Sequence, residues 1–466
     1  MIAPQIASRA QPDYADRARP LREALQKNDL WSPHQAAARR WSIGCVSLEV
    51  TQRCNLDCTL CYLSEHSEAV QDVPMEELIR RIDMVADFYG ENTDIQISGG
   101  DPTLRDADDL VQIVQAIKVR GMRSSLFTNG ILATRELLQR LAQAGMSDVA
   151  FHVDITQERK GYATEVDLNA LRDEYIERAR GLGLSVFFNT SIYAQNVADV
   201  PMLAQFFSQR SDVVRLASFQ MQAETGRGLL RARDEALTQA RIMRLIEQGV
   251  GETLNFDALI GGNPTCNRYA TAITFGRGIN TRAHDLFRNG AFIARVMRET
   301  ADLRIDRDSV FKAAGSIVRA ILKRPSLAAA GIIAASEVAW RARRSLALAR
   351  NGVNKISFFI HNFMDASALQ TERLETCVFM AATQFGPMPM CEYNARRDEV
   401  LLRPVPLADG QSWQPLAART TYSLAAASAA VTPAQVAKVY PIKFLKGRAR
   451  AVALETRHAT RAKERA

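Results

Sequence analysis

The most informative part of this sequence is Thr51-Gln-Arg-Cys54-Asn-Leu-Asp-Cys58-Thr-Leu-Cys61-Tyr62. Its three cysteines have the spacing C-x3-C-x2-C and follow the strand-like run 45–50 directly, so a short loop can turn three sulfur atoms toward one metal centre. A disulfide framework favours an even cysteine count in a secreted chain, and a structural zinc site favours a fourth Cys or His nearby. Three thiolates can instead hold three irons of a 4Fe-4S cluster and leave the fourth iron open to a ligand.

Length and composition bound the class of protein. The chain has 466 residues, 47% of them hydrophobic and 24% charged, as expected of a globular protein with a sizeable core. The odd count of seven cysteines and a polar N-terminal stretch without a secretion signal favour the cytoplasm. A net charge of +8 favours an acidic partner, either nucleic acid, anionic lipid or a phosphorylated substrate. No apolar run reaches the roughly 18 residues of a transmembrane helix.

Short apolar runs alternate with amphipathic stretches after residue 42. Six strand-then-helix units predict an α/β fold with a parallel sheet and right-handed crossovers. The predicted strands are 45–50, 94–98, 124–128, 148–154, 185–192 and 213–220, and the predicted helices are 75–88, 106–120, 134–144, 168–182, 197–208 and 234–247.

Polar residues stand where these strands end, which is where parallel barrels carry their chemistry. The second strand ends in Ser98-Gly-Gly-Asp-Pro-Thr103, whose glycines permit close backbone approach to a ligand. The third strand ends in Thr128-Asn-Gly130. The fourth and fifth strands carry His152, Asp154, Asn189 and Thr190, which either satisfy one another inside the fold or contact a ligand.

These motifs together resemble the radical S-adenosylmethionine (SAM) superfamily, whose C-x3-C-x2-C loop binds a 4Fe-4S cluster that holds SAM on its open iron. The resemblance implies a partial (β/α)6 barrel, with Cys54, Cys58 and Cys61 as metal ligands. Asp101 stands where the family's G-G-E-P element has Glu, and Leu60 stands where relatives have an aromatic against adenine. The SAM-binding residues that the resemblance implies are Leu60, Ser98, Gly99, Gly100, Asp101, Pro102, Thr128, Asn129, Asp154, Asn189 and Gln220.

A second set of cysteines lies beyond the barrel: Cys266, Cys377 and Cys391, each in a loop-like context near Pro or Gly. They are either buried free thiols or the ligands of an auxiliary 4Fe-4S cluster whose fourth ligand is not a cysteine. The block from Phe358 to Asn394 resembles the archaeal tetraether synthase group of radical SAM enzymes, although the chain lacks their cysteine-rich, rubredoxin-like segment. That resemblance favours the auxiliary cluster.

The rest of the chain divides by composition. The expected organisation is an N-terminal extension (1–41), the barrel (42–250), an auxiliary-cluster region (251–280 and 355–405), an apolar and basic insertion (281–354) and a basic tail (406–466). The stretch 326–340 within the insertion is either a packing helix or a helix on a membrane surface. We expect the tail to be solvated or to contact anionic lipid.

The predicted function is that of a radical SAM enzyme that takes hydrogen from an unactivated carbon of a hydrophobic, lipid-like substrate, at the inner face of the membrane. Arg227 and His361 are the candidate substrate contacts, because Arg227 could hold a carboxylate or phosphate. A flavodoxin or ferredoxin would donate electrons. One alternative is a peptide-modifying enzyme. Another, favoured by charge alone, is a metal-stabilised protein that binds nucleic acid.

Overall fold

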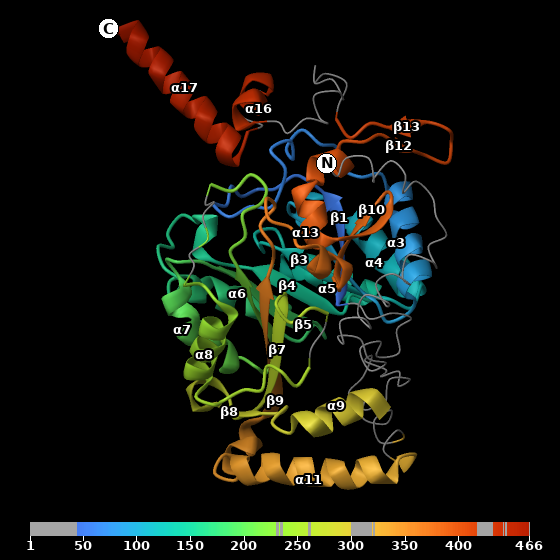
Figure 1. The fold of residues 1–466 in the computed structure, drawn as a ribbon, viewed down its shortest axis with the longest axis vertical. Coiled ribbons are helices and arrows are strands. Elements are labelled where there is room, and N and C mark those ends of the chain that lie inside the picture. The colour runs from blue at the N-terminus through green and yellow to red at the C-terminus, as the bar shows by residue number, and fades with distance from the viewer. Residues whose placement is uncertain are drawn as a thin grey trace.

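The computed structural model describes residues 44–229, 233, 236–259, 262–299, 319, 322–416, 432–440, 442 and 445–465. These residues form an α/β fold around an 11-stranded sheet with the strand order β11-β10-β1-β2-β3-β4-β5-β6-β9-β7-β8 (Figure 1). The predicted fold class is thereby confirmed. The hydrogen-bonded order is open and does not close into a complete barrel. The expected N-terminal extension, 1–41, lies outside the described residues.

Six parallel strands and the helices after them match the predicted units closely. The largest difference is in the last helix, which covers Gln239–Val250 instead of 234–247. The strands are β1 (Cys45–Thr51), β2 (Asp94–Gly99), β3 (Arg123–Thr128), β4 (Asp148–His152), β5 (Ser185–Ile192) and β6 (Val214–Met221). The helices are α3 (Met75–Tyr89), α4 (Ala107–Val119), α5 (Arg135–Ala144), α6 (Leu168–Ala179), α7 (Val200–Ser208) and α8 (Gln239–Val250).

The two faces of this sheet differ in chemistry because side chains alternate along each strand. In β1, Val46 and Leu48 pack in the apolar core with residues of the helices, whereas Ser47 and Glu49 point to the opposite face. The same alternation recurs in the neighbouring strands, so one face is covered by helices and the other carries many polar residues beside Phe127, Phe187 and Leu216. We call this second side the inner face. Besides Ser47 and Glu49, it carries Gln96, Ser98, Ser125, His152, Asn189, Ser191, Ser218 and Gln220.

Five further strands extend the sheet at both edges. The second half of the chain supplies β9 (Val353–Asn362), which pairs parallel with β6, and β10 (Phe379–Thr383), which pairs parallel with β1. His361, a candidate substrate contact, lies near the end of β9. The auxiliary-cluster region consequently forms part of the same sheet as the six units. The remaining strands are antiparallel: β7 (Asn267–Phe275), β8 (Arg282–Asp285) and β11 (Gly386–Pro389).

Strands β9 and β10, which flank the six-unit sheet on its two sides, approach each other without pairing. At the end of β9, the ring of His361 lies 5.2 Å from the ring of Phe379, which begins β10. Phe363 stacks on the same imidazole at 5.2 Å. We call this contact the seam. It gives the six-unit sheet the character of a partial barrel whose gap is filled by aromatic side chains.

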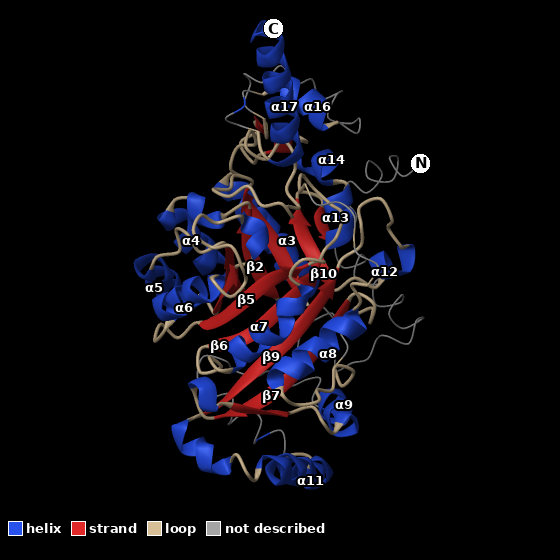
Figure 2. Cartoon of the chain, turned by 90° about the vertical axis from the view of Figure 1, so that its left-hand side faces the viewer, coloured by secondary structure: helices blue, strands red, loops and turns tan. Residues whose placement is uncertain are grey.

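The remaining helices lie at the ends and edges of the sheet. Helix α9 (Gly290–Glu299) and helix α11 (Pro325–Ala342) lie at the end where β9 begins, and α17 (Gly447–Arg465) lies at the opposite end (Figures 1 and 2). No helix in the described ranges has the length and apolarity to cross a membrane. The other elements are α12 (Thr371–Glu375), α13 (Met390–Ala395), α14 (Arg397–Leu401), α16 (Pro433–Val439), β12 (Val405–Pro406) and β13 (Ser412–Trp413).

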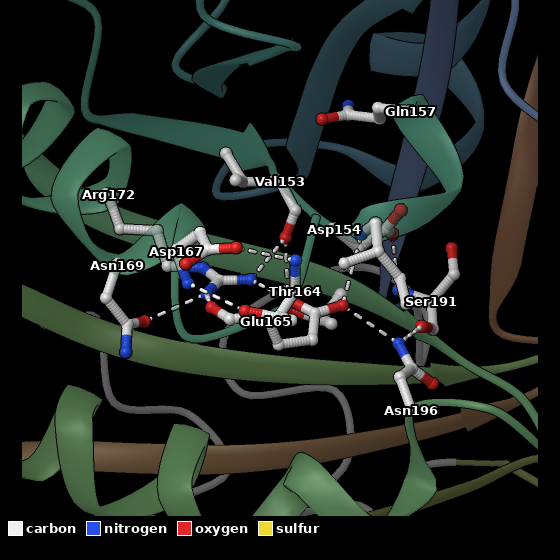
Figure 3. Close-up of polar contacts among 12 residues, drawn as sticks. Val153, Asp154, Gln157, Thr164, Glu165, Asp167, Asn169, Arg172, Ser191 and Asn196 are labelled. Carbon is white, nitrogen blue, oxygen red and sulfur yellow. Dashed lines mark hydrogen bonds and ion pairs between the residues drawn. The ribbon is translucent and has the colours of Figure 1, made fainter. Parts of the chain in front are cut away.

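A buried ion pair supports the loop after β4. The side chains of Arg172 and Glu165 are both fully buried and bonded to each other (Figure 3). Arg172 also donates to the backbone oxygen of Val153 at 2.9 Å, and Glu165 accepts from the Asn196 amide at 2.9 Å. The pair therefore joins the end of β4 to the segment after β5.

Arg172→Met should lower the free energy of unfolding by about 3–5 kcal/mol, because it leaves the Glu165 carboxylate buried without its partner. The measurement is denaturant unfolding followed by circular dichroism. The matched control is Arg140→Met, whose ion pair with Asp108 is exposed and should contribute less than about 1 kcal/mol. Equal effects in the two variants would contradict a structural role for the buried pair.

Candidate functional site

The three-cysteine loop leaves the carboxyl end of β1 and is fixed to the neighbouring strand ends. Thr59 N–H donates to the Thr156 backbone oxygen at 2.8 Å, which ties the loop to the segment after β4. Burial raises the pKa of Cys54 to about 11, and burial together with Cys61 and Cys54 raises the pKa of Cys58 well above its usual value. The three cysteines lie within eight residues of one loop, which brings their thiols to the carboxyl end of β1.

The donor set of this loop is three cysteine thiols, which are the ligands that can hold three irons of a 4Fe-4S cluster. Among the described residues, no group of three or more His, Cys, Asp or Glu side chains converges closely enough to hold one metal ion. The cysteines of a 4Fe-4S cluster each bind a different iron, so they surround a larger body. Buried thiols with raised pKa values lose their protons when bound iron supplies the compensating positive charge.

Two glycines at the end of β2 let the backbone meet the loop. Gly100 N–H donates to the Thr51 oxygen at 3.0 Å, and Asp101 N–H donates to the Arg53 oxygen at 2.8 Å. A Cβ atom on Gly99 would lie 1.9 Å from the Thr51 oxygen, and Gly99 has a φ of +132°. Only glycine satisfies both conditions, which explains the Gly-Gly pair at this point.

The Asp101 carboxylate joins the second and third strand ends. It is fully buried and accepts from Thr128 Oγ1 at 2.9 Å and from Asn129 N–H at 2.8 Å. Burial raises the pKa of Asp101. The hydrogen bonds from Thr103, Asn129 and Thr128 lower it, but by less. The Asn129 amide in turn donates to the Asn55 side chain at 2.6 Å. The predicted Thr128-Asn129 motif is thus held against the cysteine loop.

A polar group lies on the inner face where β4, β5 and β6 end. His152 Nε2 lies 2.7 Å from Asp154 Oδ2, and the Asn189 amide donates to His152 Nδ1 at 3.1 Å and to Gln220 Oε1 at 3.2 Å. Burial opposes ionisation of Asp154, but His152, Thr156 and Ser191 N–H outweigh it and lower its pKa to about 2. These side chains satisfy one another's hydrogen bonds, as the internal interpretation expects. His152 nevertheless keeps 22% of its side chain exposed, which leaves room for contact with a ligand.

The structure also brings the second cysteine set together. Burial raises the pKa of Cys377 to about 12 and that of Cys391 to about 11, and Cys391 and Cys266 add to the rise for Cys377. The Arg373 guanidinium donates to Cys266 Sγ at 3.1 Å. Cys266 and Cys377 stand directly before β7 and β10, whereas Cys391 lies in the first turn of α13 and not in a loop. All three approach the seam.

The two predicted substrate contacts have other surroundings. Arg227 is 1% exposed and faces Glu68 and the cysteine loop. His361 lies among the rings of Phe359, Phe363 and Phe379 at the seam. Burial lowers the pKa of His361 to about 3, so the imidazole is neutral. Because Phe379 lies two residues after Cys377, the contact with its ring places His361 near the second cysteine set.

Sequence reasoning missed a buried network that links the two cysteine sets. Glu49 on the inner face accepts from Arg397 at 2.7 Å and from the Tyr393 hydroxyl at 2.8 Å. The Arg397 guanidinium lies 4.8 Å from the centre of the Tyr62 ring, and the Tyr62 hydroxyl donates to the Gly99 oxygen at 2.6 Å. A charged Glu49 in an otherwise apolar strand was the available signal.

Part of the basic tail pairs with acidic residues near the cysteine loop. Lys446, Arg448 and Arg450 pair with Glu68, Glu65 and Asp57, whereas residues 454–459 are exposed. The acidic residues at 57, 65 and 68 and the basic residues of the tail are all visible in the sequence. Almost four hundred residues separate them, so the sequence does not show that they pair.

Comparison with known proteins identifies the domain. Residues 48–207 match the family model described as the radical SAM superfamily. The Fe-coproporphyrin III synthase of Methanosarcina barkeri is 32% identical over 165 residues, which are 34% of this chain and 39% of that protein. The PqqA peptide cyclase of Bradyrhizobium diazoefficiens is 29% identical over 163 residues, or 34% of this chain and 42% of that protein. The chain thus spans about two fifths of the length of these relatives.

A third relative, the 7,8-dihydro-6-hydroxymethylpterin dimethyltransferase of Methanocaldococcus jannaschii, is 28% identical over 188 residues, or 39% of this chain and 37% of that protein. Among solved structures, Streptococcus suis SuiB aligns with a TM-score of 0.34 and 17% identity, over 44% of this chain and 45% of that chain. The named relatives differ in their substrates, so the likeness concerns the domain.

Gly99→Ala should weaken SAM binding at least about tenfold, because the new Cβ collides with the Thr51 oxygen and moves the strand end from the cysteine loop. Anaerobic calorimetric titration of the reconstituted protein measures the affinity. Gly161→Ala is the matched control, since Gly161 also has a positive φ, +91°, but nothing lies within 4 Å of its added Cβ. An unchanged affinity in the Gly99 variant would contradict the proposed site.

Proposed function

Because residues 48–207 form a radical SAM domain, we propose that the chain is an enzyme that cleaves SAM and takes hydrogen from a substrate carbon. The observation that carries this proposal is the loop of Cys54, Cys58 and Cys61, held by Asp101 and its backbone against adjoining strand ends. A 4Fe-4S cluster bound there would supply the electron that splits SAM into methionine and a 5′-deoxyadenosyl radical.

The chain's own residues orient the reactants. The backbone around Gly99 and Gly100, with Thr128 and Asn129, shapes the SAM site next to the cysteine loop. The hydrogen bonds assign a proton to His152 Nε2, directed at Asp154, and leave Nδ1 accepting from Asn189. The imidazole of His152 lies on the inner face of the sheet. There it can hold a polar group of the substrate or exchange a proton with that group.

We propose an auxiliary 4Fe-4S cluster at Cys266, Cys377 and Cys391. The Arg373 donor on Cys266 supports it, as do the positions of Cys266 and Cys377 before two strands that meet at the seam and of Cys391, whose sulfur accepts from the Met364 N–H at 3.4 Å. Burial raises the pKa of Cys391 to about 11, and the nearby Arg373 and Arg233 act against that rise. A fourth ligand from outside the cysteines would complete it.

For the substrate we propose an amphiphilic, lipid-like molecule, with its polar group on the inner face. The resemblance of the 358–394 block to the tetraether synthase group supports the hydrophobic part. Helix α11 supports a peripheral membrane contact, because Ile332, Ile333 and Trp340 are 59–71% exposed on it and basic residues flank it at 323–324 and 341–344. The contact would be at the end of the molecule away from the cysteine loop (Figure 1).

A peptide is the second candidate substrate. The polar side chains of the inner face suit amide groups, and one relative is named a peptide cyclase. Comparing lipids and peptides from cells that carry the chain or its Cys58→Ala variant separates the two candidates. A changed peptide beside unchanged lipids would reverse our preference.

The reconstituted chain should bind about eight irons, four for each cluster, and should form 5′-deoxyadenosine from SAM when reduced with dithionite. Replacing Cys54, Cys58 and Cys61 with Ala should halve the iron and abolish 5′-deoxyadenosine. Replacing Cys266, Cys377 and Cys391 should halve the iron as well. Iron analysis and chromatography of the products measure both effects.

Two results would overturn parts of this proposal. A fully loaded chain that forms no 5′-deoxyadenosine would exclude the radical SAM activity. A chain that binds about four irons, unchanged in the second triple variant, would exclude the auxiliary cluster alone.

The chain should sediment with vesicles that contain phosphatidylglycerol, and less so at high salt, which screens the basic residues around α11. Ile332→Glu should weaken this binding because it places a carboxylate on the exposed apolar surface. Val119→Glu is the matched control, since Val119 is 78% exposed on α4 and away from α11. Equal binding by both variants would remove α11 as the membrane contact.

A further inference from the structure

Residues 446–450, which we call the C-terminal strap, lie on the cysteine loop. The Lys446 ammonium group donates to the Cys54 backbone oxygen, and Gly447 N–H donates to Asp57 Oδ1 at 2.8 Å. Arg450 pairs with the same carboxylate at 3.1 Å. The strap therefore contacts the loop through its backbone and through an acid that stands between two of the cysteines.

A Gly-Arg-Gly segment lies beneath the strap and packs on the same loop. Gly228 N–H donates to the Cys61 oxygen at 3.1 Å, and Arg227 N–H donates to the Leu63 oxygen at 2.9 Å. A Cβ atom on Gly226 would lie 2.3 Å from the Tyr62 carbonyl carbon, and one on Gly228 would lie 2.7 Å from the Cys61 nitrogen. The absence of side chains on both glycines lets the segment bring Arg227 against the loop.

The strap closes over this segment. Arg448 N–H donates to the Arg227 oxygen at 3.1 Å, and the Arg448 guanidinium donates to the Gly226 oxygen at 2.8 Å. A Cβ atom on Gly447 would lie 2.2 Å from the Arg227 oxygen. The cysteine loop, the Gly-Arg-Gly segment and the strap thus form three layers of backbone in direct contact.

The Arg227 side chain lies inside these layers. Its Nη1 pairs with Glu68 at 3.3 Å, and Glu68 also pairs with Lys446 at 3.2 Å. Its Nε and Nη2 are buried without a hydrogen-bond partner among the described residues. Burial lowers the pKa of Arg227, but Cys61, Glu68 and Cys54 outweigh burial and raise this pKa. Arg227 in turn lowers the pKa of Cys58 against the larger effects of burial and the other two thiols.

We propose that Arg227 is a positioning residue that holds the cysteine loop and keeps a buried positive charge beside the cluster bound there, which raises the cluster's reduction potential. The inference rests on the proposed function. Reduction adds negative charge to the cluster, and a fixed positive charge in a buried, poorly screened site stabilises the reduced state. The free Nε–H and Nη2–H groups are donors that cluster sulfur can accept.

The test is a redox titration of the reconstituted full chain, followed by electron paramagnetic resonance in the background of the Cys266, Cys377 and Cys391 triple variant. Arg227→Met should lower the equilibrium constant for one-electron reduction at least tenfold, which is about 59 mV. Arg227→Lys keeps the charge and should stay near the wild-type potential. A fully loaded Arg227→Met chain with an unchanged potential would overturn the inference.

Should Arg227→Met fail to hold iron, Arg227→Lys decides. A loaded Lys variant with the wild-type potential supports the charge, whereas an equal loss of iron in both variants overturns it. Failure of the proposed function is distinguishable, because the loaded parent chain would then form no 5′-deoxyadenosine, whatever its reduction potential.

Two glycine variants test the strap. Gly447→Ala should speed the loss of iron to a chelator several-fold, since the added Cβ cannot fit against the Arg227 oxygen. Gly278→Ala is the matched control: Gly278 has a φ of +58° against +57° for Gly447, but nothing lies within 4 Å of its Cβ. Equal rates of iron loss in the two variants would overturn the role of the strap.

Discussion

The buried carboxylate of Asp101 is the interaction on which the candidate site depends. It accepts hydrogen bonds from the segment after β3, while the backbone around it bonds the loop after β1. Three strand ends that are far apart in the sequence thereby become one rigid surface. A carboxylate so deeply buried is stable only with such donors, because an unpaired buried charge is costly. The position of the cysteine loop is consequently set by hydrogen bonds of the second and third strands.

Much of the six-unit sheet could be predicted because its signals are local. An apolar run followed by an amphipathic stretch recurs six times, and strands such as Ser185–Ile192 match their predicted bounds. The glycines of the second strand end and the C-x3-C-x2-C loop also carry their chemistry in adjacent residues. Residues 48–207, which match the family model, fall within this predictable part.

The parts that could not be predicted depend on pairing between distant residues. Strand β10 joins β1 across more than three hundred residues, with Cys45 opposite Phe379, and nothing in either segment specifies the other. The same limit hid the salt bridges of the basic tail. Arg227 was visible as a functional residue, but only the fold shows that its guanidinium faces inward, toward the cysteines.

The strap has a consequence for how the protein is made. Lys446 contacts Cys54 across 392 positions, so the ribosome completes the cysteine loop early and its cover very late. During synthesis the three thiols stand in a loop that lacks its outer layer. The strap can dock only after residues 446–450 have been synthesised, so the loop and its cover are made at opposite ends of translation.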